Sequence, residues 1–201
     1  MSNHLIIFIK NPLEGKVKTR IAATAGDKSA LEIYLQLLKI TKTIALPLDC
    51  HKHLFYSDFI DKRDDWPNEL FSKHIQKGTD LGQRMKNAFA DVFSVDGASE
   101  KKVLIIGSDC AELSSSSIKN SFQALNDTDF VIGPTFDGGY YLIGMKKYRP
   151  EVFYNIKWST ETVFSSTVSF FNNSASSFTE LPPLHDIDTY VDWETFQGKV
   201  S

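Results

Sequence analysis

The chain has 201 residues, 42% of them apolar and 23% charged, a composition typical of folded globular proteins rather than disordered ones. At about 150 residues per domain, the length predicts a single domain over residues 1–201. The net charge of −3 argues against a broad basic face that coats nucleic acid. The longest apolar run, Leu5 to Ile9, is too short to cross a bilayer, and two cysteines build neither a disulfide scaffold nor a four-cysteine zinc site. We therefore expect a soluble, cytoplasmic protein.

Short apolar segments alternate along the chain with longer stretches of helical period. This alternation predicts βαβ units on a mainly parallel sheet, a three-layer α/β/α fold. Strands are expected at residues 4–9, 53–56, around Ile75, and at 103–106, 130–132 and 140–145. Helices are expected from Asp27 to near Pro47, from Thr79 or Asp80, after the serine run 114–117, from Ser159 or Thr160 through Phe171, and over 190–196. In the first helix, the apolar face should carry Leu31, Leu35, Leu38 and Ala45.

The loop after the first predicted strand, residues 10–20, is strongly basic. It has four basic residues and one acidic residue, a charge of +3 in a chain of −3. Ligands of open α/β sheets bind beyond the carboxyl ends of the strands, and clustered cations beside a glycine suit a diphosphate. The loop is not a Walker A motif, because Val17 stands where that motif needs glycine. A solvated basic loop is the alternative. The predicted phosphate-binding residues are Lys10, Gly15, Lys18, Thr19 and Arg20.

Acidic residues stand at two further strand ends. Asp109 directly follows a buried predicted strand, where a carboxylate can hold a metal ion or cap the next helix. Asp186 and Asp188 lie in a segment that Pro182 and its neighbouring proline keep extended, so both should point to one side. We predict that these three aspartates hold one Mg²⁺ or Mn²⁺ ion, although Asp188 could instead cap the final helix. Asp192, on the exposed side of that helix, should matter little.

The sequence Phe-Asp-Gly-Gly-Tyr-Tyr at residues 136–141 allows two interpretations. Asp-Gly between apolar runs is a common hairpin signal. The same glycines and tyrosines also suit the wall and floor of a pocket for a sugar or small acceptor. In that interpretation Asp137 positions the acceptor or acts as its general base. Trp158 either lines this pocket or packs in the core.

Other reactive residues support no function. His51 and His53 share a strand face, but no neighbouring third ligand completes a zinc site, so we expect surface histidines. The chain lacks a Gly-x-Ser-x-Gly nucleophile elbow, and Cys110 has no basic partner nearby in sequence. Hydrolase chemistry is therefore unsupported.

Segments spread over nearly the whole chain carry a family resemblance. They are residues 8–12, 15–20, 76–85, 106–110, 133–144, 158–160 and 186–189. In this order they resemble the small nucleotide-diphospho-sugar transferases, also called radical-SAM/selenodomain-associated transferases, which have a GT-A-type fold. The resemblance implies that Asp109 takes the metal-binding part of the glycosyltransferase Asp-x-Asp motif. It adds nucleotide-binding residues Gly78, Asp80, Gly82 and Arg84, and acceptor-binding residues Gly138, Gly139, Tyr140, Trp158 and Ser159.

The resemblance implies a metal-dependent transferase with a nucleotide-activated donor, and it favours glycosyl transfer from a nucleoside-diphosphate sugar to a small acceptor. The alternative is a nucleotidyltransferase, similar to 2-phospholactate guanylyltransferase and molybdopterin guanylyltransferase, which joins an NTP to a phosphorylated acceptor and releases pyrophosphate. A catalytically inactive nucleotide-binding protein is a second alternative, suggested by Ala111 where the family usually has proline. The expected partners are the donor and acceptor alone, without nucleic acid.

Overall fold

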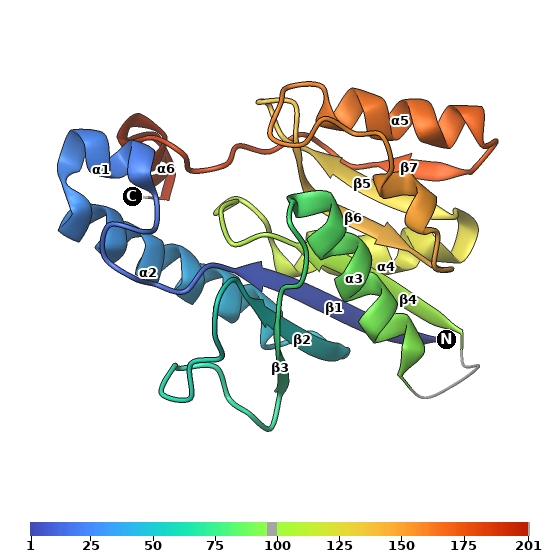
Figure 1. The fold of residues 1–201 in the computed structure, drawn as a ribbon, viewed down its shortest axis with the longest axis horizontal. Helices are drawn as coiled ribbons and strands as arrows, with labels where there is room; N and C mark the ends of the chain where they lie inside the picture. Colours follow the sequence, from blue (N-terminus) through green and yellow to red (C-terminus); the bar gives the residue numbers. More distant parts are fainter. Residues whose placement is uncertain (96–99, 201) are drawn as a thin grey trace.

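The computed structural model describes residues 1–95 and 100–200 as an α/β fold (Figure 1). This confirms the predicted fold class. Its elements are β1 (Ser2–Ile9), α1 (Thr19–Ala25), α2 (Asp27–Ala45), β2 (His51–Tyr56), β3 (Phe71–Ile75), α3 (Leu81–Ser94), β4 (Lys101–Ile106), α4 (Ser115–Asp127), β5 (Phe130–Pro134), β6 (Tyr140–Met145), the 3₁₀ helix η1 (Pro150–Phe153), α5 (Val163–Asn173), β7 (Phe178–Glu180) and α6 (Tyr190–Val200).

The strands form one mainly parallel sheet in the order β3-β2-β1-β4-β6-β5-β7. Only β6 runs against the others, since it pairs antiparallel with both β4 and β5 while the remaining pairs are parallel. The carboxyl ends of the parallel strands therefore meet at one edge of the sheet. In folds of this type that edge is where ligands bind.

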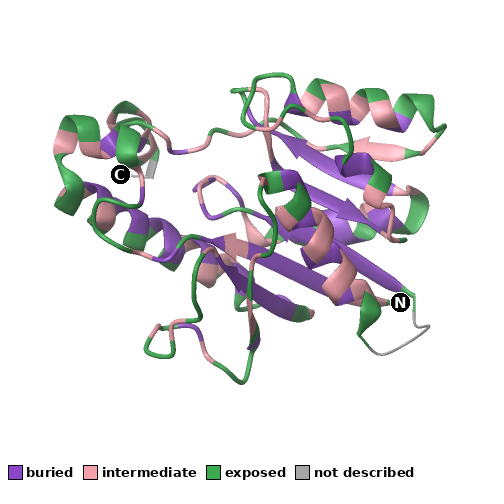
Figure 2. Cartoon of the chain, viewed as in Figure 1, coloured by how far each residue is buried: buried purple, intermediate pink, exposed green. Residues whose placement is uncertain are grey.

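Helices cover both faces of the sheet, so the predicted three layers are confirmed. On one face, residues such as Leu5 and Ile7 pack against α2 and α4. On the other, residues such as Ile6 pack against α3, η1 and α5. The central strands are largely buried, whereas α1 and α6 lie together beyond the end of β1 (Figures 1 and 2). Among the described residues, no helix is both long and apolar enough to span a membrane.

The structure departs from the expected helices at three places. Helix α1 was not predicted, because it has seven residues and buries only Ile21. In α2, Leu35 is 47% exposed while the flanking Tyr34 is buried, so the apolar face is rotated from the predicted one. Helix α5 begins at Val163 rather than at Ser159 or Thr160, because Ser159 has a φ of 63°, which interrupts a right-handed helix.

The two predicted surface histidines differ in the structure: His51 is exposed as expected, whereas His53 belongs to a buried stack on one face of the sheet. His53 is only 7% exposed; its ring stacks on His4 of β1 and lies 5.6 Å from the ring of His74 on β3. His4 Nδ1 and His53 Nε2 are 3.1 Å apart. Burial, with the neighbouring histidines and Lys101 adding to it, lowers the pKa of His53 to about 3.

This pKa predicts acid sensitivity of the fold. In the unfolded chain His53 titrates near pH 6.5, so unfolding takes up a proton between about pH 6.5 and 3. The stability from neutral His53 is complete above this window and is lost as pH falls through it. Urea unfolding should show that the unfolding free energy of the wild type is lower at about pH 5 than at about pH 7. In His53→Phe this loss should be smaller by roughly 2 kcal/mol.

His51→Phe is the matched control, since His51 is an exposed position of the same strand. It should keep most of the wild-type pH dependence, because burial is the largest cause of the low His53 pKa and the charge of His51 adds less to it. An equally steep loss of stability in His53→Phe and in the wild type would contradict this interpretation.

Candidate functional site

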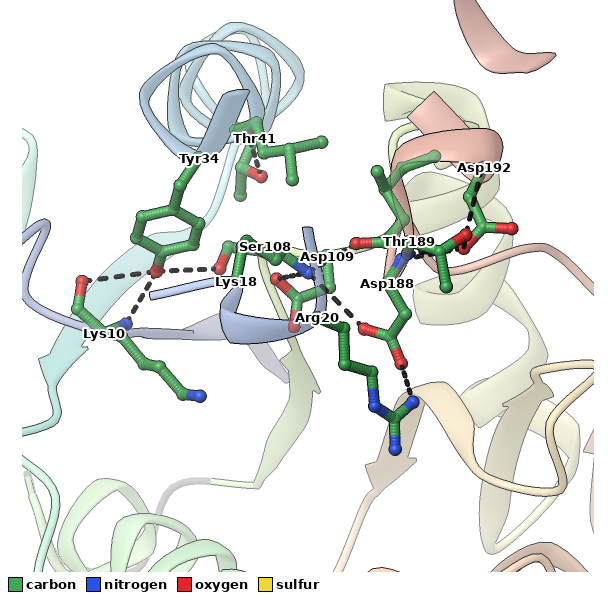
Figure 3. Close-up of polar contacts among 12 residues, drawn as sticks. Lys10, Lys18, Arg20, Tyr34, Thr41, Ser108, Asp109, Asp188, Thr189 and Asp192 are labelled. Atoms are coloured by element: carbon green, nitrogen blue, oxygen red, sulfur yellow. Dashed lines mark hydrogen bonds and ion pairs between the residues drawn. The ribbon is translucent and has the colours of Figure 1, made fainter. Parts of the chain in front are cut away.

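Lys18 lies where the basic loop enters α1, and its side chain is turned into the protein. The residue has a φ of 46°, an unusual conformation for a residue other than glycine. Only 6% of its side chain is exposed. The ammonium Nζ lies 2.8 Å from Asp109 Oδ1 and 3.6 Å from Asp188 Oδ1, and it donates a 2.6 Å hydrogen bond to the Ile187 carbonyl (Figure 3). Lys18 thus joins the loops after β1 and β4 to the segment before α6.

That segment is fixed by its backbone as well as by Lys18. The buried Ile187 donates its N–H to the Asp109 carbonyl at 2.9 Å. Asp192 Oδ2 accepts hydrogen bonds from the backbone N–H groups of Asp188 and Thr189 and from the Thr189 hydroxyl (Figure 3). Asp192 is therefore a poor choice as a residue of little importance, because its carboxylate holds the turn that carries Asp188.

Asp109, Asp186 and Asp188, called here the carboxylate cluster, concentrate negative charge at the carboxyl edge of the sheet. Burial raises the pKa of Asp186 to about 7, with Asp109, Asp137 and Asp188 raising it further and Lys18 opposing them. Carboxylates this close repel one another unless a cation lies among them. In the structure that cation is the Lys18 ammonium.

The oxygen ligands of the cluster suit Mg²⁺ or Mn²⁺, which prefer carboxylates. Within residues 1–95 and 100–200, however, no three His, Cys, Asp or Glu side chains are already grouped to hold an ion. Asp109 and Asp188 contact Lys18 instead. The donor chemistry therefore fits a divalent ion, provided that Lys18 withdraws, and the metal assignment stays a prediction.

Three hollows meet at the carboxylate cluster. The first, about 330 Å³, lies between β1, β4 and α3, and Asp109 and Asp186 line it. The second, about 390 Å³, lies under the basic loop and shares Asp109 with the first. The third, about 440 Å³, lies beside the β5–β6 turn and shares Asp186 with the first and Asp188 with the second. The cluster can therefore contact ligands in all three.

The predicted nucleotide-binding residues divide into two groups. The second hollow is lined by Lys10, Lys18, Thr19 and Arg20, while Arg84 lines the first. Arg20 is 75% exposed and pairs with Asp188 Oδ2 at 3.2 Å.

The other group has structural contacts. Asp80 caps α3 by accepting a hydrogen bond from the Gln83 N–H. Gly15 and Gly78 have positive φ angles, and a Cβ on Gly78 would lie 2.7 Å from Gln83 Cβ. Gly82 lies against the Trp158 indole. These four residues shape the loops around the hollows.

The β5–β6 turn has the hydrogen bonds of a turn and also borders the third hollow. Asp137 Oδ1 accepts hydrogen bonds from the Thr135 hydroxyl at 2.5 Å and the Gly139 N–H at 3.1 Å, as expected for a residue that stabilises a turn. The same carboxylate lines the third hollow. Gly138 has a φ of 89°, and a Cβ there would lie 2.1 Å from the Glu161 carbonyl. Other predicted acceptor residues that line this hollow are Gly139, Tyr140, Trp158 and Ser159.

One residue of the site, Tyr34, was missed in the sequence. The Tyr34 hydroxyl accepts a 2.7 Å hydrogen bond from the Lys10 N–H and lies 3.3 Å from Ser108 Oγ (Figure 3). It thereby ties the exits of β1 and β4 together beneath the first two hollows. Burial raises the pKa of Tyr34, which keeps the hydroxyl protonated. A tyrosine on the buried face of a helix usually needs such a partner, and this was the available signal.

The contact between Gly82 and Trp158 leads to a test of the third hollow. A Cβ on Gly82 would lie 2.2 Å from the indole, so Gly82→Ala should displace Trp158. We expect a shifted tryptophan emission spectrum and a loss of about 1–3 kcal/mol in unfolding free energy. The spectral shift should be absent when Gly82→Ala is made in a Trp158→Phe background.

Gly198→Ala is the matched control, because a Cβ at that position of α6 has no neighbour within 4 Å. Its emission should equal that of the wild type. If Gly82→Ala also leaves the emission unchanged, Trp158 does not occupy the described position.

Comparison with solved structures shows which proteins share this fold. A crystal structure from Desulfovibrio desulfuricans G20, described as a "putative nucleotide-diphospho-sugar transferase", is similar with a TM-score of 0.89 and 31% identity over 98% of this chain and 87% of that chain. A 4-diphosphocytidyl-2C-methyl-D-erythritol synthase from Anaerococcus prevotii DSM 20548 has a TM-score of 0.64 and 13% identity, covering 99% and 96% of the two chains.

Another structure with the same fold is Rv0371C of Mycobacterium tuberculosis H37Rv in complex with manganese, with a TM-score of 0.56 and 8% identity over 97% of each chain. At such identities the likeness concerns the fold alone. No curated protein matches the chain. The model of the family described as "Uncharacterized protein conserved in bacteria (DUF2064)" matches residues 41–160. With the similarity to the Desulfovibrio protein, this match shows that the chain belongs to the DUF2064 family.

Proposed function

We propose that residues 1–201 act as one metal-dependent transferase, which moves the glycosyl group of a nucleoside-diphosphate sugar to a small acceptor. One observation carries the proposal: two hollows beside the basic loop and a third beside the β5–β6 turn meet at the carboxylate cluster. A donor in the first two and an acceptor in the third would bring their reacting groups together at the cluster.

The first two hollows have the chemistry that a nucleotide needs. The first has apolar walls from residues such as Phe8, Ile9 and Met85, which suit a nucleobase and ribose. The second has Lys10 and Arg20 on its walls. Arg20 can hold a phosphate with two parallel hydrogen bonds, whereas Lys10 supplies a point charge. The diphosphate of the donor would thus lie under the basic loop.

The carboxylate cluster would hold Mg²⁺ or Mn²⁺, which would neutralise the departing nucleoside diphosphate. Arg20 and Lys10 bind the phosphates and add to that neutralisation. Asp137 accepts the proton of the acceptor hydroxyl as its oxygen forms a bond to the anomeric carbon. The bond from that carbon to the diphosphate breaks, and its electron pair leaves with the diphosphate.

Two observations favour glycosyl transfer. Tyr140 and Trp158 line the third hollow, and aromatic rings suit the apolar face of a sugar. The similar structure at 31% identity is described as a nucleotide-diphospho-sugar transferase, whereas the synthase with a cytidyl product is 13% identical. Nucleotidyl transfer is the competing outcome of the following experiment.

The test is to incubate the protein and Mn²⁺ with individual nucleotide-sugars and NTPs, with and without a mixture of small acceptors, and to identify the products. The proposal predicts release of nucleoside diphosphate from a nucleotide-sugar, accelerated by acceptor. Pyrophosphate release from an NTP would contradict glycosyl transfer and support nucleotidyl transfer instead. Binding of donor without turnover in any mixture would instead support an inactive nucleotide-binding protein.

Arg20→Lys tests the donor half of the site. It keeps the charge but removes the two parallel hydrogen bonds, so nucleotide affinity measured by calorimetry should fall about tenfold, or roughly 1.4 kcal/mol. Arg63→Lys, at an exposed position of the β2–β3 loop, is the matched control and should leave affinity unchanged. Equal affinity in the wild type and Arg20→Lys would show that the loop is a solvated surface.

A further inference from the structure

We propose that Lys18 is a built-in counter-cation of the carboxylate cluster, and that its ammonium and a divalent metal ion occupy the cluster as mutually exclusive alternatives. In the donor-free protein Lys18 holds the cluster together. When metal and donor bind, the ammonium leaves Asp109 and Asp188 and moves to the phosphates. This inference rests on the proposed function, since the phosphates are those of the proposed donor.

The first support is the placement of the ammonium. Lys18 is 6% exposed, although it belongs to a basic loop whose Arg20 is 75% exposed. Its Nζ contacts are Asp109 Oδ1, Asp188 Oδ1 and the Ile187 carbonyl, all of them in or beside the cluster. A lysine that only bound phosphates would be expected to point into the second hollow rather than toward the carboxylates. The structure thus shows Lys18 neutralising the cluster.

The second support is the backbone of Lys18. With a φ of 46°, it is one of few described residues other than glycine with a positive φ. Such conformations are disfavoured and persist where surrounding contacts fix them. The Lys18 carbonyl accepts the N–H of Ala22, while the side chain is held by the ion pair with Asp109 and the bond to the Ile187 carbonyl. The unusual backbone therefore directs the side chain to the cluster, and loss of the ion pair would remove one of the contacts that hold it there.

Metal and ammonium compete for the same carboxylates. Mg²⁺ and Mn²⁺ bind carboxylate oxygens directly, and Asp109 Oδ1 already lies 2.8 Å from Lys18 Nζ. A divalent ion on Asp109 and Asp188 would stand close to the ammonium, and two neighbouring cations repel each other. Metal binding therefore favours withdrawal of Lys18 from the cluster.

The second hollow offers the displaced ammonium a destination. Lys18 lines that hollow together with Lys10 and Arg20. Lys16 lines it too, so a further cation is unfavourable there while the hollow lacks an anion and becomes favourable once a diphosphate is bound. Metal binding without nucleotide should therefore be weak, and metal and donor should strengthen the binding of each other.

The experiment measures Mn²⁺ affinity of the nucleotide-free protein by electron paramagnetic resonance and calorimetry. Removing the ammonium in Lys18→Met should raise Mn²⁺ affinity about tenfold or more over the wild type. Lys18→Gln, which keeps an N–H donor for the Ile187 carbonyl, should do the same. Lys16→Met removes one positive charge from an exposed position of the same loop and should change Mn²⁺ affinity by less than about twofold.

Unchanged or weaker Mn²⁺ affinity in both folded Lys18 variants would overturn the inference. If neither variant folds, the wild-type protein supplies the test through the ammonium protons of Lys18 in ¹H–¹⁵N spectra. Mg²⁺ should abolish their protection from exchange, and persistent protection at saturating Mg²⁺ would overturn the inference.

Failure of the proposed function has a different signature. One such result is that the Lys18 variants bind Mn²⁺ more tightly while the wild type binds neither nucleotide-sugar nor NTP. This result would support the exchange of ammonium for metal but reject the proposed nucleotide donor. Nucleotide binding without any gain in Mn²⁺ affinity would reject the exchange alone.

Discussion

The ion pair between Lys18 and Asp109 connects parts of the chain that lie far apart in the sequence. It anchors the start of α1, the loop after β4 and the segment before α6 to one point at the carboxyl edge of the sheet. The Lys18 side chain is 6% exposed, so removing its partner Asp109 would leave an uncompensated charge inside the protein, which usually destabilises a protein more than the intact pair stabilises it. The arrangement of the three hollows therefore depends on the Lys18 ammonium.

The sheet provides a rigid support, and the loops at its edge provide the charged groups of the site. Central strands buried on both faces give a rigid edge, and Tyr34 locks the ends of β1 and β4 together. On this edge the loops place carboxylates with an internal cation, whereas Arg20 stays exposed. Because its charged groups are already in place within the protein, such a site can bind a dianionic ligand or a divalent ion. The balance between the carboxylates and the Lys18 ammonium then determines which ligand the cluster binds.

Much of the fold could be predicted because its signals are local. The strand at 140–145 and the cap at Ser114 follow from apolar runs and a serine before a helical period, and both match the structure. The basic loop and the aspartates could be found as separate features. Their pairing could not, because Lys18 meets Asp109 only when the sheet brings two strand ends together. The same reason explains why the burial of His53 escaped prediction, whereas Asp192 bonds to Asp188 and Thr189 within one turn, and its Thr-x-x-Asp spacing was a local signal.

The most direct test of the central claim is a crystal structure with Mn²⁺ and a non-hydrolysable nucleoside-diphosphate sugar. The account predicts an anomalous difference peak at the carboxylate cluster, the diphosphate under the basic loop, and Lys18 Nζ on a phosphate oxygen rather than on Asp109. Nucleotide bound elsewhere, or Lys18 still paired with Asp109 beside a bound metal ion, would contradict it.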